Sequence, residues 1–544
     1  MSLSKPYRPW SPGQGFLLPP SPLDWLPESH LVYFILDVVD GLDLDAIERV
    51  VRQRDPRGNR PYHPRMMTAL LLYGYCTGVA SSRKLERASY EDLPTRVLTG
   101  GQHPDHTVIS EFRRVHLESF KAIFVTTVRL SQQAGLVKLG RVALDGTKVD
   151  ANASKHKAMS YKRMLKTAAE LEVEIERMLE QAEQADRQED TLHGKGRRGD
   201  ELPSELARRE DRLRKIKDAM AALEAEAAKT RAETVRGQAE TARAKAEQAD
   251  DDEQDKKTRA ADRAEERARE AADKASAKAQ ARVVRAEEEL RKAEAKATTR
   301  KRKRALGKAR QALDSARRAL AALAASKACA GEQDEAPALP VHRVPADKNG
   351  DPTPGAQRNF TDSDSRIMKR GGEYTQAFNA QAAADELHQI IVSCAVTNQP
   401  PDQEHLPAML EQIEKNCGAY PDEFLGDAGY WDEAHVSFCE ERDVDAYIAT
   451  GRRKHGESPP AVKGRIPKNL DAKGRMRRKV ATKKGKKAYS RRKAIIEPVF
   501  GQIKEARGFR RFLLRGIEKV DSEWALICAG HNLLKIFRAR PLAA

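Results

Sequence analysis

The sequence predicts an α/β domain that is preceded by a helical N-terminal domain and interrupted by a long coiled-coil insertion. The chain has 544 residues, enough for about three or four domains. Lys162 to Asn359 contains no Phe, Trp or Tyr, so this stretch cannot build an ordinary hydrophobic core. Apolar residues follow a helical spacing before this stretch, and strand-like runs follow it.

The N-terminal part is expected to comprise a disordered tail over 1–19 and a helical DNA-binding domain over 20–135. Helical spacing is clear over 31–51 and 66–79, and two shorter helices are expected on either side of a Gly-Gly turn. This arrangement resembles a helix-turn-helix with Thr107 to His116 as its recognition helix, which would offer to DNA Ser110, Arg113, Arg114 and His116. A plain helical bundle with surface arginines fits nearly as well.

The arm is expected over 161–339, where Ala, Glu, Arg and Lys dominate and no proline occurs between Pro203 and Pro337. Two runs have apolar residues at heptad spacing: Leu206, Leu213 and Met220 with Ile216 and Leu223, then Leu306, Leu313 and Leu320 with Ala316 and Leu323. Breaks are expected at 193–200 and 248–255. We therefore predict a two- or three-helix antiparallel arm, with a solvated and partly disordered charged helix as the alternative.

The α/β domain is expected over 136–160 and 340–538, on both sides of the arm. Strand-like runs lie at 139–154, 373–385, 389–398, 423–431 and 444–450, with a helix at 406–418. Strands separated by a helix indicate a mixed sheet. The arm is therefore inserted after the first strand or hairpin of that sheet.

The charge is concentrated in one segment. The chain carries a formal net charge of +17 and has a pI of about 9.4, which argues for a polyanionic partner such as nucleic acid. Residues 452–493 hold 18 Lys or Arg residues and two acids, Glu457 and Asp471, a net of +16. We predict a flexible basic loop that binds phosphates, rather than a segment that only aids solubility.

Membrane and disulfide-bonded classes are not expected. No apolar stretch of about 18 residues occurs, and the first residues lack the apolar run of a signal peptide. The cysteines show neither a CxxC pair nor zinc spacing: Cys76, Cys329, Cys394, Cys417, Cys439 and Cys528. The expectation is a soluble intracellular protein without disulfides or zinc.

Three acids are candidates for chemistry. Asp145 and Asp427 are each expected at the end of an apolar strand. Glu497 lies on an apolar helix, where a carboxylate is unexpected unless it has a function. Hard divalent cations are bound by a few carboxylates, and a pair of cations supports in-line displacement at phosphorus. A lone strand-end aspartate is more often a turn or cap residue, and competitors lie nearby: Asp150, Asp362, Asp364 and Asp432.

Several blocks, in this order, resemble a known family: LDGTKVDANASK, NFTDSDSRIM, YTQAFNAQAAAD, FLGDAGYW, IEPVFGQIK and the stretch from RGFRRFLLRG to NLLKI. They are similar to bacterial insertion-sequence transposases with a DDE catalytic domain of ribonuclease H-like fold. The similarity covers roughly residues 20–160 and 355–540. Within that family the chain resembles the IS-eleven-eighty-two-like group, which is related to the IS-four and IS-five types.

This resemblance implies that Asp145, Asp427 and Glu497 form the catalytic, metal-binding triad, with two Mg²⁺ ions or with Mn²⁺ in their place. Related elements carry a tyrosine seven residues before the glutamate, an arginine four before it and a lysine seven after it. Lys504 fits the last position, whereas Ser490 and Lys493 occupy the first two.

Neighbouring residues complete the expected site. Tyr489 and Arg492 lie one residue away from the family's positions, and Pro498 suggests that the helix starts or kinks there. The residues expected to bind DNA are Arg113, Arg114, Lys483, Lys484, Lys486, Lys487, Arg491, Arg492, Lys493, Lys504, Arg510 and Arg511. Residues expected to line the site or to satisfy backbone groups are Lys148, Asn152, Asn379 and Gln381, and single histidines are expected in packing or surface positions: His388, His405, His435 and His531.

The expected function is a DNA transposase that cleaves the ends of its element and joins them to target DNA by metal-dependent phosphoryl transfer. Its partners would be terminal inverted repeats, target DNA and a second copy of the chain, in the bacterial cytoplasm and nucleoid-associated when bound to DNA, with no membrane. The alternatives are a catalytically silent DNA-binding scaffold and a nuclease that cuts without joining.

Overall fold

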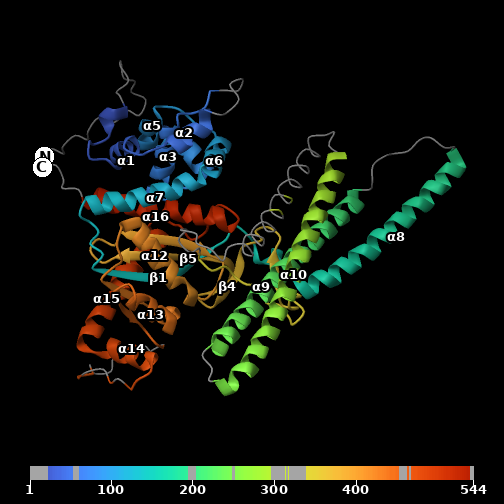
Figure 1. Cartoon of the computed structure of the whole chain (residues 1–544). Coiled ribbons are helices and arrows are strands. Elements are labelled where there is room, and N and C mark those ends of the chain that lie inside the picture. The colour runs from blue at the N-terminus through green and yellow to red at the C-terminus, as the bar shows by residue number, and fades with distance from the viewer. Residues whose placement is uncertain are drawn as a thin grey trace, which may run out of the picture.

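The structure, a computed structural model, describes residues 22–52, 60–193, 204–247, 251–295, 313, 317, 339–451, 462–464, 467 and 469–539. The expected tail over 1–19, most of the second heptad run, Cys329 and the start of the basic segment lie outside the described residues. The described chain forms a body around one six-stranded sheet, from which long helices project (Figure 1).

The N-terminal region is helical, as predicted. Pro64 lies in the first turn of its helix, where its missing N–H has no role, and Asp105 caps the last of the short helices. Gly100 and Gly101 adopt positive φ and form the predicted turn. The elements are η1 (Pro22–Trp25), α1 (Leu31–Asp40), α2 (Asp45–Arg52), α3 (Pro64–Thr77), α4 (Ser82–Glu91), α5 (Leu93–Thr99), α6 (His106–Val115) and α7 (Leu117–Gln133).

One mixed sheet forms the centre of the body. Its strands are β1 (Arg141–Asp150), β4 (Arg366–Arg370), β5 (Glu373–Asp385), β6 (Ile391–Thr397), β7 (Glu423–Gly426) and β8 (Asp445–Ile448). Their order is β4-β5-β1-β7-β8, and β6 also pairs with β5. β5 is antiparallel to β1, whereas β7 is parallel to β1 and β8 is parallel to β7. All the predicted strands are present, and the predicted helix is α12 (Leu406–Cys417).

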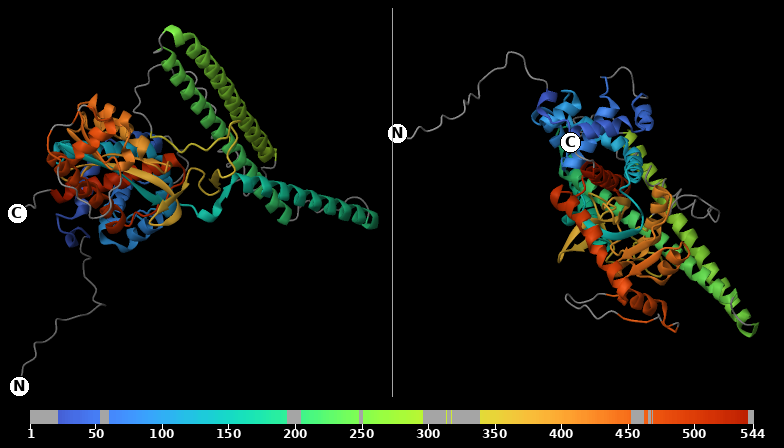
Figure 2. Two further views of the ribbon diagram at one scale, coloured as in Figure 1. Left: turned by 90° about the horizontal axis from the view of Figure 1, so that it is seen from below. Right: turned by 90° about the vertical axis from the view of Figure 1, so that its left-hand side faces the viewer.

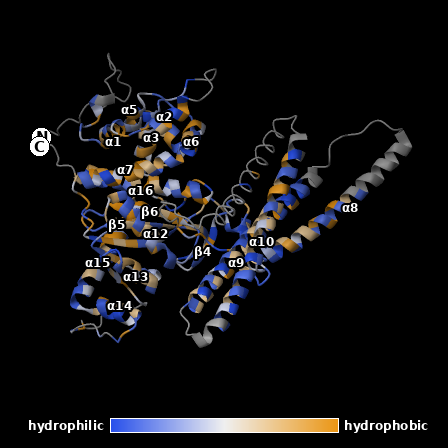
Figure 3. Ribbon diagram, viewed as in Figure 1, coloured by the Kyte–Doolittle hydropathy of each residue, from blue (hydrophilic) through white to orange (hydrophobic). Residues whose placement is uncertain are grey.

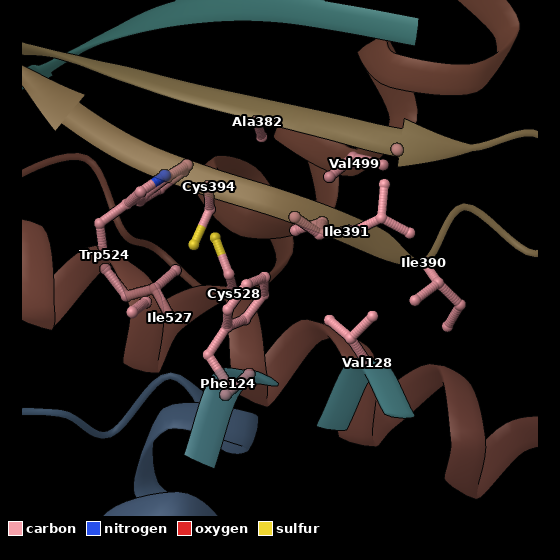
Figure 4. Packing of buried hydrophobic residues seen from close by; sticks show 14 of the residues in the cluster. Phe124, Val128, Ala382, Ile390, Ile391, Cys394, Val499, Trp524, Ile527 and Cys528 are labelled. Atoms are coloured by element: carbon pink, nitrogen blue, oxygen red, sulfur yellow. The ribbon is translucent and has the colours of Figure 1, made fainter. Parts of the chain in front are cut away.

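The core lies between this sheet and two long helices. α7 packs beside α16 (Ile517–Ala539), and α16 also packs against β6 and α3. Figure 4 shows Trp524 and Ile527 of α16 together with Phe124 of α7 and Cys394 of β6. A continuous cluster of buried apolar side chains therefore joins the N-terminal helices to the sheet.

The prediction that Asp145 ends its strand is wrong. β1 continues to Asp150, and every residue from Val142 to Asp150 has a partner on β5, with Asp145 opposite Ala382. The strand continues because β5 is long enough to pair with it on one side, although β7 pairs only with the first residues on the other side.

The flexible loop predicted over 452–493 is also wrong where the structure describes it. Ala472–Ala481 forms α14 and Lys483–Gly501 forms α15. The side chains of Asp471 and Thr482 cap these helices by accepting backbone N–H bonds from Gly474 and Gly485. Lys and Arg are good helix formers, so a basic segment with two caps and a few buried apolar residues folds as a helical pair.

Pro498 does not start its helix, because α15 begins at Lys483 and runs through Pro498 to Gly501. Proline cannot donate the hydrogen bond that the Ala494 carbonyl would receive within the helix. Gln389 Nε2 donates to that carbonyl instead, at 3.0 Å. A π-helical segment over Gln502–Ala506 follows directly.

The arm contains three long described helices, α8 (Tyr161–His193), α9 (Ser204–Glu247) and α10 (Asp251–Ala295). Of the predicted breaks, residues 194–200 and 248–250 lie outside the described residues, whereas 251–255 are helical and belong to α10, so the second break is wrong there. α9 and α10 pack along each other, whereas α8 diverges from α9 (Figures 1 and 2). Near the body, Met164 and Leu171 of α8 are buried against Ile216 and Leu223 of α9. Figure 3 shows that hydrophilic residues otherwise dominate these helices. Coiled-coil geometry remains a prediction.

The base of the arm is a two-stranded sheet. β2 (Ala158–Ser160) pairs antiparallel with β3 (Gln357–Asn359), just before α8 and just after the arm. No helix among the described residues is long and apolar enough to cross a lipid bilayer.

Candidate active site

Two parallel strands bring Asp145 and Asp427 to neighbouring positions. β1 and β7 pair with Ala143 opposite Leu425. Asp145 and Asp427 each follow this last pair by two residues, and Asp427 lies close enough to Asp145 for its negative charge to raise the pKa of Asp145. The structure therefore brings these two predicted acids together.

The Asp145 carboxylate is largely buried and hydrogen-bonded. Oδ1 accepts from the Gly146 N–H at 2.8 Å, and Oδ2 accepts from Arg492 Nη1 at 3.1 Å. Burial raises the pKa of Asp145 to about 6, although the Arg492 guanidinium opposes this shift, and the negative charge of Asp427 adds to it. Asp145 and Asp427 thus share a site that favours a further positive charge.

Asp427 caps the short helix η4 (Ala428–Tyr430), where its Oδ1 accepts from the Gly429 N–H at 2.7 Å. It lies on the wall of an open cavity of about 860 Å³. Arg477, Arg492 and Lys493 line the same cavity from α14 and α15. Acidic and basic side chains therefore line the same cavity, which suits a phosphate group with a cation.

Glu497, the third predicted acid, lies on the solvent side of α15. Its side chain is 58% exposed, and its Oε1 is 3.9 Å from Lys493 Nζ, one helical turn away. The buried face of α15 is formed instead by Ile495, Ile496 and Val499. In this structure Glu497 does not line the cavity that Asp427 lines.

The sequence analysis did not single out Asp402, which also lines the cavity. It lies in the loop after β6, and its Oδ1 accepts from Asn379 and Gln381, at 2.6 Å and 2.8 Å. The sequence signal that could have pointed to such a partner is the spacing of Asn379 and Gln381, two polar residues on one face of an otherwise apolar strand. Polar groups on a buried strand need a hydrogen-bond partner, and here that partner is Asp402.

Arg113 cannot be a DNA-binding residue in this structure, because it is 5% exposed and points into the protein. Its guanidinium donates to the Ala80 carbonyl and, at longer range, to the hydroxyls of Tyr75 and Ser82. Arg114, the next residue on α6, is exposed and pairs with Glu111. The predicted recognition helix exists as α6, but Arg113 faces away from solvent.

The basic residues of α15 differ in their partners. Lys484 pairs with Asp445 at 3.0 Å, and Arg491 pairs with Glu386. Arg492 is mostly buried, and it donates to Asp145. Both Arg492 and Lys493 line the cavity. Other predicted positions on α15 are exposed or half-buried on its first turns: Lys483, Lys486 and Lys487.

The remaining predicted DNA-binding residues follow α15. Lys504 donates to Thr147 Oγ1 and to the Lys148 carbonyl, and burial lowers the pKa of Lys504 to about 8. Arg510 is exposed and pairs with Glu505. Arg511 forms an isolated parallel bridge with Asp150, so its backbone extends the edge of β1.

The other polar residues have structural surroundings. Asn152 donates to the Leu513 carbonyl, and Lys148 donates to the Pro400 carbonyl at 2.7 Å. Of the four single histidines, His388 is exposed, whereas His405, His435 and His531 are buried. The five cysteines in the described residues are free thiols.

Among the described residues, a single group of three acids or histidines brings its ligand atoms all within 4.8 Å of one another: Glu86, Asp105 and His106. His106 Nδ1 lies 2.8 Å from Glu86 Oε2, and Asp105 caps α6, so hydrogen bonding accounts for this group. Asp145 and Asp427 belong to no group of three that meets this distance in the described chain.

Comparison with known proteins gives two family matches. Residues 461–537 match the model described as "Transposase DDE domain", and residues 20–115 match the model described as "Transposase domain (DUF772)". No curated protein and no solved structure matches the chain. The first match spans α14, α15 and most of α16, and the second spans the N-terminal helices up to α6. Together with the helical N-terminal region and the mixed sheet, these matches support a transposase of the DDE type.

Proposed function

We propose that the chain is a DNA transposase that cleaves the ends of its insertion sequence and joins them to target DNA, and that its sheet belongs to a ribonuclease H-like catalytic domain. The sheet topology supports this fold, because the antiparallel strands β1, β5 and β6 are followed by β7 and β8 in parallel on the other side of β1. Membership of the IS-eleven-eighty-two-like group is part of the same proposal.

The observation that carries the proposal is the juxtaposition of Asp145 and Asp427 beside a basic wall. Support comes from the charge of Asp427, which raises the pKa of Asp145, from Arg492, which donates to Asp145, and from the cavity that Asp427 lines together with Arg477, Arg492 and Lys493. A phosphodiester in this cavity would lie between anionic ligands for a cation and cationic side chains for its oxygens.

The donor set fits a hard divalent cation. Asp145 and Asp427 offer carboxylate oxygens, which Mg²⁺ and Mn²⁺ prefer, and the pKa of Asp145 is raised by burial and by the charge of Asp427 although Arg492 opposes the shift. We propose these two residues as metal ligands, with Glu497 as the third member of the triad. Bound there, the divalent cations would supply Lewis acidity for displacement at phosphorus.

The chain's own residues orient the DNA. Lys493 and Arg477 are placed to contact phosphate oxygens at the cavity, and Arg492 holds the Asp145 carboxylate in position. The first turns of α15 add exposed lysines on the same helix. The proposed partners are the terminal inverted repeats and target DNA, with the transposase acting as a homodimer.

A cleavage assay with labelled element ends tests the proposal. Asp145→Asn, Asp427→Asn and Glu497→Gln should each reduce Mg²⁺-dependent cleavage by about 10³-fold or more, because an amide keeps the shape but loses the anionic ligand. Binding to the ends should change little. Removing one acid should cost as much as removing all three, since members of one site act as a unit.

The control is Asp432→Asn, five residues after Asp427. Asp432 caps α13 (Glu433–Glu440) through the Ala434 N–H, and asparagine can serve the same role. This variant should retain cleavage. Full activity in Asp145→Asn would refute the assignment. Wild-type cleavage without joining would indicate a nuclease, and end binding without cleavage would indicate a silent scaffold.

A further inference from the structure

Asp402 gives the cavity another carboxylate, outside the predicted triad. It lies at the end of the loop that leaves β6, and its side chain is 24% exposed. The cavity that contains Asp427 is lined by Asp402 as well. The position of the Asp402 side chain therefore depends on how this loop packs against β5.

One oxygen of Asp402 is held by several donors. Oδ1 accepts from Asn379 Nδ2 at 2.6 Å and from Gln381 Nε2 at 2.8 Å, and Lys148 Nζ lies 3.4 Å away. Asn379 and Gln381 are fully buried on β5. Buried amides that converge on one carboxylate oxygen fix the side chain strongly, so the direction of the carboxylate is set by the sheet.

The orientation of the Gln381 amide is fixed by a residue of the Asp427 turn. Tyr430, three residues after Asp427, donates its hydroxyl to Gln381 Oε1. The amide nitrogen of Gln381 must then face Asp402, because only that end can donate. A chain of hydrogen bonds therefore couples the Asp402 carboxylate to the turn that carries Asp427.

Two glycines leave space for the Asp402 carboxylate. A Cβ at Gly146 would lie 2.7 Å from Asp402 Oδ1 and would also overlap Gln381 Nε2. The point where a Cβ would stand at Gly429 is 3.7 Å from Asp402 Oδ2 and 2.9 Å from Asp427 Oδ1. The second oxygen of Asp402 is thus directed toward the Asp427 side of the cavity.

An unsatisfied buried group lies behind this carboxylate. His405 is fully buried, and neither of its ring nitrogens has a hydrogen-bond partner in the described structure. Its Nδ1 is 3.9 Å from Asp402 Oδ1. Because buried polar groups are nearly always paired, an unpartnered imidazole pointing at Asp402 indicates a site that is complete only with a further group.

We infer that Asp402 is a ligand of a divalent cation in the same cavity, through Oδ2 and together with Asp427. The inference rests on the proposed function, since it concerns the cation that the proposed reaction needs. The role of the amides and of Lys148 is to hold Oδ1, which leaves Oδ2 for the cation. Carboxylates fixed in this way are the ligands that hard divalent cations use.

Mn²⁺ titration of the full chain by calorimetry tests the inference. Asp402→Asn should weaken Mn²⁺ binding by about tenfold or more, as Asp427→Asn should. The matched control is Glu404→Gln, two residues further along the same loop and exposed, which should bind Mn²⁺ like the wild type. Gly146→Ala should weaken binding without removing any carboxylate, because its Cβ displaces Asp402 and Gln381.

A purely structural role predicts a different result. In that case Asp402→Asn would lower the melting temperature and leave Mn²⁺ affinity within about twofold, and this outcome would overturn the inference. If the variant does not fold, Fe²⁺ with ascorbate and peroxide can cut the wild-type backbone near bound metal. Cuts near residues 402 and 427 are expected, and cuts near 427 without any near 402 would also overturn it.

The two proposals can fail separately. Loss of cleavage in Asp145→Asn with normal Mn²⁺ binding in Asp402→Asn would retain the transposase and remove Asp402 from its metal site. Normal cleavage in Asp145→Asn would instead refute the proposed function, whatever Asp402 does.

Discussion

The guanidinium of Arg113 stabilises the junction between the N-terminal helices and α16. Glu523 of α16 is buried near it and accepts from the Tyr75 hydroxyl and from the backbone N–H groups of Leu513 and Leu514. Burial raises the pKa of Glu523, and the positive charge of Arg113 opposes that shift. The Tyr75 hydroxyl connects the two buried charges, because Arg113 donates to it and it donates to Glu523, and this chain links two parts of the body.

Replacing Arg113 should destabilise the fold rather than weaken DNA binding directly. Arg113→Ala leaves Glu523 buried without its counter-charge, which typically costs about 3–5 kcal/mol. Arg114→Ala, at an exposed ion pair, should change the free energy of unfolding by about 0.5 kcal/mol or less. Urea unfolding measures both. An Arg113→Ala variant of normal stability with weakened DNA binding would contradict the buried assignment.

Individual site residues were predictable only where a local pattern placed them. Asp145 and Asp427 each follow a run of apolar residues, and these runs lie on the paired parallel strands β1 and β7. Asp402 has no such local pattern, because its position depends on β5, β1 and the Asp427 turn at once. Arg113 was predicted wrongly for the same reason, since its partners lie on α3, on α4 and in the segment between them.

Among the elements, α14 and α15 hold the charge that should govern DNA affinity. Lys483 and Lys487 are exposed on the first turns of α15. Lys484, between them in sequence, is paired with Asp445. Helical order fixes which of these ammonium groups can reach a phosphate, whereas a flexible loop would make all of them equivalent.

The salt dependence of DNA binding distinguishes these cases. Lys483→Ala and Lys487→Ala should each reduce the slope of log affinity against log salt by about 0.9, the value for one lost phosphate contact. Lys484→Ala should change it less, because Asp445 already neutralises that charge. Equal effects at all three positions would favour an unstructured basic segment, and no effect at any would show that this face of α15 does not contact DNA.

Strands were easier to predict than these helices for a physical reason. β5 and β6 are buried on both faces and therefore read as long apolar runs. In α14 and α15 the glycines suggested a loop, yet Gly485 lies where a Cβ would overlap the Lys479 carbonyl, so the close crossing of the two helices requires it. Such a crossing is a tertiary contact, which no local pattern reports.

At the scale of the whole molecule, the body and the arm have separate apolar cores. The main cluster of buried residues draws on the N-terminal helices, the sheet and α16, and it includes no described residue between 161 and 338. The arm has its own cluster, in which Ile216 and Leu223 of α9 pack against Met164 of α8. The aromatic-free stretch contributes no described residue between 161 and 338 to the main cluster, as expected of a segment without large core formers.

Contacts between the arm and the body include the apolar packing of Val344 and Ala356 against the arm cluster and several polar pairs. Arg358 pairs with Glu226 at 2.5 Å, and Lys278 pairs with Asp351 at 2.7 Å. The Tyr161 hydroxyl donates to Glu224 at 2.7 Å. When the arm is absent, these body residues become exposed to water, which can replace the lost hydrogen bonds at little cost.

Excision of Leu165 to Ala330 should therefore leave a folded body. Its melting temperature should stay within about 4–8 °C of the corresponding transition of the full chain, the shift produced by about 1 kcal/mol in a small domain. Calorimetry and the mass in solution check this result.

The matched variant is Ile216→Asp in the full chain, which should melt the arm and leave the body transition in place, because Ile216 belongs only to the arm cluster. Loss of all soluble protein on excision would show that the body needs the arm to fold, and a full-chain dimer that persists after excision would place the subunit interface on the body.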